Sequence, residues 1–126
     1  MPVRSLASSV LRWPDREAVD RAVRTWAAEV ARADERILRV GYFGSYARGN
    51  WVVGSDVDIV LVLGETSEPF ERRALAYDAG ALPVPADVLV YTVGEWERMA
   101  SEGGLPRTVA RDVVWVYSRP DVDSAS

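Results

Sequence analysis

The sequence predicts an α/β domain in which helices flank a small mixed β-sheet. Segments with the apolar spacing of helices alternate along the chain with short strand-like segments, the order typical of α/β domains. The segment 57–63 is almost entirely apolar, which indicates a strand buried on both faces. With 48% apolar and 27% charged residues the composition is that of a globular protein, and 126 residues correspond most simply to one domain, 1–126.

The longest helix is predicted from its apolar stripe. In the segment 15–33, Val19, Val23, Trp26 and Val30 recur at offsets of four, three and four, so they share one face that we assign to the core. Further helices are expected at 46–48, 67–80, 92–100 and 107–112, and strands at 37–43, 57–63, 86–91 and 113–117.

The helix at 92–100 has a recognisable start. Thr92 and Glu95 stand at the spacing of a capping box, in which each side chain bonds the other residue's backbone N–H. We interpret Glu95, Glu97 and Glu102 as solvated charges on this helix, and Trp96 as a packing residue.

The two ends of the chain show neither the apolar spacing of a helix nor that of a strand. Residues 1–13 have no clear period, and the polar segment 118–126 is expected to fray. No apolar run reaches membrane-spanning length and no signal peptide is evident near the start, so we expect a cytoplasmic protein that does not enter a membrane.

The residue types that the chain lacks exclude several chemistries. It has no cysteine and no histidine, which excludes disulfides, thiol catalysis, zinc sites built from these residues and the Ser-His-Asp triad. All fifteen basic residues are arginine, so lysine Schiff bases and a Walker-type lysine are also excluded. Carboxylates, hydroxyls, arginine and the backbone remain, and this inventory suits carboxylate–Mg²⁺ chemistry.

The charge pattern argues against direct binding of a long nucleic acid. The net charge is −4 and the pI is about 4.8. The arginines are scattered, with only Arg72 and Arg73 adjacent, whereas a nucleic-acid track normally needs a basic stripe.

The segment 44–58 carries the strongest functional signal. Gly44 and Ser45 end a predicted strand, where a glycine lets the backbone approach a ligand and the free N–H groups of a helix start attract phosphate. Asp56 and Asp58 lie two apart in an extended run, so both carboxylates leave one face of the strand. Carboxylates gathered in this way repel each other unless a cation such as Mg²⁺ compensates. The pattern therefore predicts chemistry on a nucleoside triphosphate.

This segment resembles the signature of the minimal nucleotidyltransferases of the DNA polymerase β superfamily, most densely over 37–63. The resemblance implies a nucleotidyltransferase fold and catalysis with two Mg²⁺ ions held by Asp56, Asp58 and a third carboxylate on a later strand. Asp87, which starts the predicted strand at 86–91, matches that third position, where it would bind metal and act as the general base. A turn residue after Pro85 is the alternative interpretation of Asp87.

The same resemblance assigns nucleotide contacts. It implies that Gly44, Ser45 and Arg48 hold the triphosphate. Arg48 has a second interpretation, as a structural partner of the carboxylates. Trp51 lies in a bulkier stretch than we expect of the family, and it could stack on a base or simply pack.

The function that the resemblance implies is transfer of AMP from ATP to a hydroxyl, most specifically a tyrosine of a HEPN-type toxin that this protein would silence as an antitoxin. Two alternatives stay open. One is an antitoxin that binds its partner with an idle nucleotide site, and the other is a small-molecule nucleotidyltransferase of the aminoglycoside-modifying kind, which normally needs an additional domain.

Overall fold

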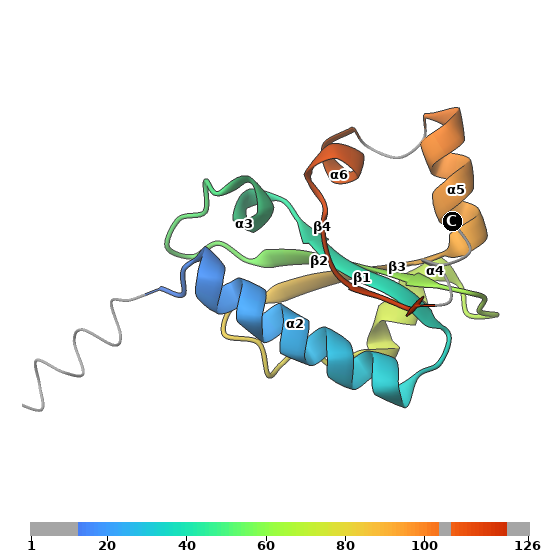
Figure 1. The fold of residues 1–126 in the computed structure, drawn as a ribbon, viewed down its shortest axis with the longest axis horizontal. Helices are drawn as coiled ribbons and strands as arrows, with labels where there is room; N and C mark the ends of the chain where they lie inside the picture. The colour runs from blue at the N-terminus through green and yellow to red at the C-terminus, as the bar shows by residue number, and fades with distance from the viewer. Residues whose placement is uncertain (1–12, 104–106, 121–126) are drawn as a thin grey trace, which may run out of the picture.

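The computed structural model describes residues 13–103 and 107–120, which form a sheet with helices on both faces (Figure 1). The strands are β1 Ile37–Phe43, β2 Val57–Leu63, β3 Ala86–Thr92 and β4 Val114–Ser118. The helices are α2 Arg16–Ala33, α3 Ser45–Arg48, α4 Phe70–Arg73, α5 Val93–Glu102 and α6 Arg107–Asp112, with a 3-10 turn η1 at Ala74–Ala76. The predicted α/β class is confirmed, while the interpretation of residues 1–12 lies outside the described part.

The sheet is mixed, as predicted. Its strands lie in the order β3-β2-β1-β4, so β2 and β1 are central. β1 runs antiparallel to β2 and to β4, whereas β2 and β3 are parallel. A parallel pair needs a crossover connection, and the segment with α4 and η1 provides it.

β2 is buried along its whole length except at one residue. Every side chain of the strand is buried apart from the half-buried Asp58. Ile59 lies opposite Tyr42 of β1, and the Tyr42 hydroxyl donates a 2.7 Å hydrogen bond to Asp20 of α2. Ile59 and Tyr42 therefore face α2, and Asp58, next along the strand, faces the other side of the sheet.

Helix α2 covers one face of the sheet with the predicted stripe. Asp15 caps it, because its side chain accepts a hydrogen bond from the N–H of Ala18. Val19, Val23 and Trp26 are buried in the core, which confirms their assignment. Within the described residues, no helix has both the length and the apolar character needed to cross a membrane.

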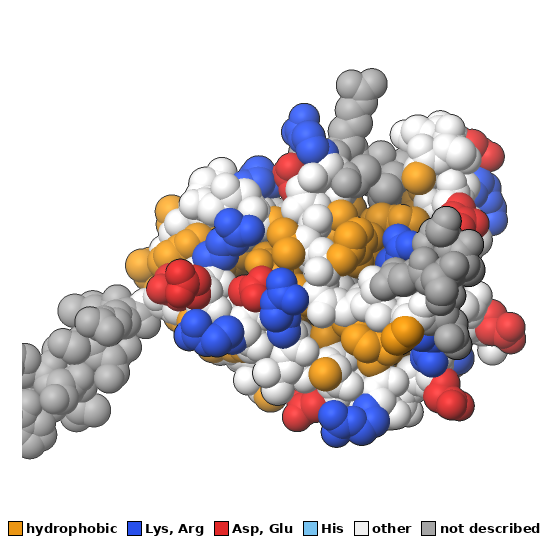
Figure 2. Space-filling view, viewed as in Figure 1, with side chains coloured by type: hydrophobic (Ala, Val, Ile, Leu, Met, Phe, Trp, Pro, Cys, Tyr) orange, Lys and Arg blue, Asp and Glu red, His pale blue; other side chains and the backbone are white. Residues whose placement is uncertain are grey.

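Helix α5 lies on the side of the sheet away from α2 (Figure 1). The predicted capping box is present, with reciprocal bonds between Thr92 and Glu95. Trp96 of α5 packs between Tyr91 of β3 and Trp115 of β4, with ring centroids 6.0 and 5.4 Å apart. Figure 2 shows apolar side chains gathered between α6 and α5, with charged side chains around them.

Glu95 is not a solvated charge, which corrects the interpretation made from the sequence. Its carboxylate accepts hydrogen bonds of 2.7 and 3.1 Å from the two terminal nitrogens of Arg73, a buried residue at the end of α4. Arg73 also donates to the carbonyls of Val90 and Glu68. The hydrogen bonds from Arg73 lower the pKa of Glu95 to about 2. The Glu95 carboxylate is thus held by Arg73, a residue that is distant from it in the sequence.

The prediction of one long helix at 67–80 is wrong. Only α4 and η1 are helical there, and at Tyr77 the chain is extended, with φ −124° and ψ 103°. Two tertiary contacts explain this: Arg73 is held by Glu95, and the Tyr77 hydroxyl donates a 2.7 Å bond to Asp34 after α2. These bonds join Arg73 to α5 and Tyr77 to the residue after α2, and in the structure the chain is not helical between Tyr77 and Gly80.

Two residues of the segment expected to fray are bonded to the sheet. Ser118 is the last residue of β4 and pairs with Arg39. The Arg119 N–H donates to Leu38 at 2.8 Å, and its guanidinium donates to Ile37 at 3.1 Å and to Glu35. Residues 121–126 of the predicted tail lie outside the described residues.

The ion pair between Arg73 and Glu95 should stabilise the fold above acidic pH. Glu95→Gln should lower the free energy of unfolding at pH 7 by about 1–2 kcal/mol, less than for a fully buried pair because the Glu95 side chain is 35% exposed. Since folding depresses the Glu95 pKa from 4.5 to about 2, this stabilisation is complete above 4.5 and disappears as the pH falls toward 2. Urea unfolding at several pH values measures the difference.

Glu97→Gln is the matched control, since it removes an exposed charge from the same helix. A difference between wild type and Glu95→Gln that stays constant from pH 7 to pH 3 would contradict the assigned ion pair.

Candidate active site

A glycine turn joins β1 to the short helix α3. Gly44 has φ 83° and ψ −153°, a conformation that residues with a side chain rarely adopt, and it lets the chain turn sharply after Phe43. α3 then begins at Ser45 and ends at Gly49, whose left-handed backbone closes the helix with a bond to the Ser45 carbonyl. The predicted short helix and its two ends are confirmed.

The loop between α3 and β2 is held by its own bonds. Trp51 stacks on Tyr46 with a centroid distance of 5.6 Å and an interplanar angle of 8°, so of its two interpretations the packing one is observed. The N–H of Val52 donates to the Ser55 hydroxyl, and the N–H of Ser55 donates to the Val52 carbonyl, each at 2.9 Å. These two bonds fix the turn that directly precedes Asp56.

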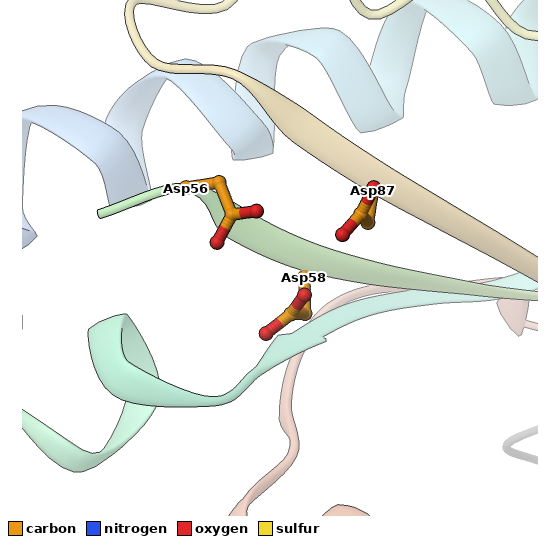
Figure 3. A group of neighbouring side chains, drawn as sticks. All are labelled: Asp56, Asp58 and Asp87. Carbon is orange, nitrogen blue, oxygen red and sulfur yellow. The ribbon is translucent and has the colours of Figure 1, made fainter. Parts of the chain in front are cut away.

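Asp56, Asp58 and Asp87 come together at the start of the parallel strand pair (Figure 3). Asp58 of β2 is in register with Asp87 of β3, so both lie on the face away from α2. Asp56 lies just before β2. One oxygen from each carboxylate lies within 4.8 Å of the others, with Asp56 and Asp87 exposed and Asp58 half-buried.

The electrostatics of this cluster favour a cation. Burial raises the pKa of Asp58 above its usual value, and the negative charges of Asp56 and Asp87 raise it further. Arg48 acts in the opposite direction and lowers the Asp58 pKa. A half-buried carboxylate beside two others is destabilised when ionised, and a bound cation would remove that penalty.

Gly44 lies directly against this cluster. A Cβ atom at Gly44 would lie 2.3 Å from the Asp58 Oδ2, which is closer than any two such atoms can approach. The glycine therefore has two roles, since it permits the turn and leaves room for the Asp58 carboxylate. The turn of Gly44 and Ser45 is thereby placed beside the carboxylates.

Arg48 is paired with a residue that the sequence did not single out. Its Nη1 lies 3.5 Å from the Oδ2 of Asp112, the last residue of α6. No local motif marks Asp112, because the contact joins two short helices that are far apart in the chain. The contact observed for Arg48 is therefore with a carboxylate outside the cluster, and its two interpretations, as a phosphate ligand and as a partner of the cluster, stay predictions.

The donor set fits a divalent cation of the magnesium type. Three carboxylates offer hard oxygen ligands within a few ångströms of one another, and two of them are exposed enough to share a cation with a substrate. No nitrogen or sulfur ligand is present, since the chain has no histidine and no cysteine.

Comparison with known families identifies this arrangement. The family model described as a nucleotidyltransferase domain matches residues 24–98, more than half of the chain, including the Gly44 turn and all three carboxylates. The chain therefore belongs to the nucleotidyltransferase domain family, and its class is that of a transferase.

Two solved structures share the fold. A candidate nucleotidyltransferase from Sulfolobus solfataricus has a TM-score of 0.61 and 24% identity, with 82% of this chain and 84% of that chain covered. A chain from a mutant of the toxin–antitoxin MntA–HpeT has a TM-score of 0.52 and 23% identity, with 79% and 75% covered, respectively. No curated protein sequence matches this chain.

Asp58→Asn should stabilise the protein when no divalent cation is present. Removing one of three crowded charges relieves repulsion, so the melting temperature at pH 7 should rise by roughly 3 °C. Because folding raises the Asp58 pKa, its penalty is greatest above that pKa, and the advantage of Asn should shrink as the pH falls toward 3.8. Thermal melts in EDTA at pH 7 and pH 4 check this.

Mg²⁺-ATP should then raise the melting temperature of the wild type more than that of Asp58→Asn. Glu65→Gln, which removes an exposed charge just beyond the other end of β2, should behave like the wild type. An equal Mg²⁺-ATP shift in Asp58→Asn and wild type would argue against Asp58 as a metal ligand.

Proposed function

We propose that this protein transfers AMP from ATP to a hydroxyl of a partner protein, and that it thereby silences a HEPN-type toxin as its antitoxin. The observation that carries the proposal is the close grouping of Asp56, Asp58 and Asp87 beside the Gly44 turn in a nucleotidyltransferase domain. The HEPN partner rests on the resemblance of segment 37–63 to minimal nucleotidyltransferases. We place this activity in the cytoplasm, where ATP and Mg²⁺ are abundant.

Each site residue has a defined role in this proposal. Asp56 and Asp58 would hold two Mg²⁺ ions, with Asp87 as a further ligand of one of them. Bound Mg²⁺ supplies charge neutralisation at the phosphates and polarises the reacting oxygens. Gly44 and Ser45 would offer backbone N–H groups to the β- and γ-phosphates. Most of the catalysis is then positioning and electrostatic stabilisation.

The reaction is balanced by one bond formed and one broken. The acceptor oxygen attacks the α-phosphorus, and a new oxygen–phosphorus bond forms. The bond from the α-phosphorus to the oxygen that bridges it to the β-phosphate breaks, and pyrophosphate leaves. The proton of the acceptor hydroxyl passes to the Asp87 carboxylate, which is exposed on the site face and free to release it to solvent.

A protein acceptor is favoured by the rim of the site. Val52 and Val53, in the loop that leads to Asp56, are 65% and 71% exposed. We infer that these two neighbouring exposed valines contribute apolar area to a contact with a protein acceptor. The fold likeness to a chain of the MntA–HpeT toxin–antitoxin is consistent with such a partner.

Two other functions remain as competing hypotheses. A binding antitoxin with an idle site would not need a carboxylate at Asp58, whose pKa is raised by burial and then by the charges of Asp56 and Asp87. A small-molecule nucleotidyltransferase would need a pocket for its acceptor beside the carboxylates. Three cavities of about 710, 420 and 430 Å³ have none of the three carboxylates among their lining residues.

The proposal predicts a defined change of mass. A HEPN-type protein incubated with this protein and Mg²⁺-ATP should gain AMP units of roughly 329 Da each, as metal-assisted nucleotidyl transfer requires. Intact-mass spectrometry measures the product, and Asp56→Ala and Asp87→Asn should abolish it. If the partner is inhibited without any mass change, and Asp56→Ala inhibits equally well, the idle-site hypothesis is correct instead.

The rim valines should affect the acceptor and not the nucleotide. The double change Val52→Ser and Val53→Ser should slow AMP addition to a partner below saturation by roughly tenfold, because it removes apolar contact area at the rim. The thermal shift caused by Mg²⁺-ATP should stay unchanged. Leu75→Ser is the control, since Leu75 is 81% exposed but lies in η1, away from the site. Equal rates for both variants would remove the support that the valines give to a protein acceptor.

A further inference from the structure

Asp112 is a carboxylate in an unusual position at the end of α6. Its side chain is only 14% exposed, and among the described residues its Oδ2 has no hydrogen-bond partner although the atom is buried. The charged groups near it are Arg48, with Nη1 3.5 Å from Oδ2, and Arg111, with Nε 3.5 Å from Oδ1. A buried carboxylate oxygen with so little compensation is costly, so its position calls for a specific reason.

The backbone brings Asp112 to this place through close packing on β1. A Cβ atom at Gly41 would lie within 2.8 to 2.9 Å of Val113, Val114 and Trp115, so only glycine lets this segment lie so close to β1. The N–H of Val113 bonds the carbonyl of Val109, which ends α6. Asp112 therefore directly precedes a segment that packs closely against β1.

Arg48 lies on α3, the short helix that begins at the turn beside the three-carboxylate cluster. It is one helical turn from Gly44, since the N–H of Arg48 bonds the Gly44 carbonyl at 3.0 Å. Gly44 in turn lies against the Asp58 carboxylate, because a Cβ atom at Gly44 would collide with the Asp58 Oδ2. An arginine has five N–H donors in a fixed fork, so one edge can face Asp112 while another remains available to an anion at the cluster.

We propose that Asp112 is a positioning residue that holds the Arg48 guanidinium at the carboxylate cluster, oriented to receive a phosphate of the bound nucleoside triphosphate. This inference rests on the proposed function. A long side chain that is already held loses less conformational freedom when the ligand binds, so binding is tighter.

The expected effect has the opposite sign to that of simple charge repulsion. Asp112 is negative and lies near a site for a polyanion, so its removal would tighten binding if only its charge mattered. If Asp112 instead competed with phosphate for Arg48, its removal would also tighten binding. A positioning role alone predicts that Asp112→Asn weakens the binding of Mg²⁺-ATP.

Isothermal titration of the full chain with Mg²⁺-ATP tests this. Asp112→Asn should raise the dissociation constant by about five- to tenfold, and Arg48→Met by a similar or larger factor. The double variant should bind no more weakly than Arg48→Met, because Asp112 acts only through Arg48. Asp112→Glu, which keeps the charge, should recover most of the loss, which a general packing defect would not allow.

Two controls separate the specific effect from damage to the fold. Arg111→Met removes the exposed arginine on the other oxygen of Asp112 and should leave the affinity unchanged. Asp112→Ser provides the same test if Asp112→Asn does not fold.

The outcomes distinguish failure of this inference from failure of the proposed function. If the wild type binds Mg²⁺-ATP and Asp112→Asn binds equally or more tightly, the inference is overturned and the proposed function stands. Additive losses in the double variant would also overturn it, since they indicate independent roles. If the wild type does not bind Mg²⁺-ATP, both the proposed function and the inference are wrong.

Discussion

The position of β2 in the sheet is the constraint on which the rest of the structure depends. The strand is paired along both edges, antiparallel to β1 and parallel to β3, and it is buried on both faces. Such a strand has no contact with solvent except where it begins, and there it carries Asp58. α2 covers one face and α5 the other, and the carboxylate site lies at the end where the strand starts.

The site places charges where folding alone would not favour them. The carboxylates of Asp56, Asp58 and Asp87 repel one another, yet the register of β2 and β3 holds two of them side by side. Neutral apolar side chains there would give a more stable domain. The repulsion is tolerated because the long buried strand stabilises the pairing, and it leaves the cluster ready for a cation and a polyphosphate. The start of β2 therefore carries the candidate site, and the rest of the strand stabilises the fold.

The sequence predicts the features that depend on neighbours in the chain. The capping box of Thr92 and Glu95, the glycine ends of α3 and the apolar run of β2 follow local rules, and the structure contains each of them. The grouping of Asp56 and Asp58 follows from strand alternation, while Asp87 also needed a family resemblance, because a parallel register cannot be inferred from one chain.

The features that the sequence did not predict depend on contacts between distant residues. The bonds of Arg73 to Glu95 and of Tyr77 to Asp34 shorten the helix expected at 67–80. The spacing of apolar residues in the sequence does not predict these bonds. Asp112 reaches Arg48 only because Gly41 lets the start of β4 lie close to β1. In both places, contacts between residues distant in the chain determine the structure, and local sequence preference does not.

The register between Asp58 and Asp87 also makes the site a reporter of folding. The parallel pairing of β2 and β3 needs a crossover connection, so it brings together residues that are distant in the chain and is expected to form more slowly than a hairpin. A slip of one residue in this pairing would turn Asp87 to the α2 face and leave the cluster incomplete. Chains that have collapsed with a wrong register would therefore be compact yet fail to bind a cation, so cation binding during refolding would report when β3 pairs with β2 in its native register.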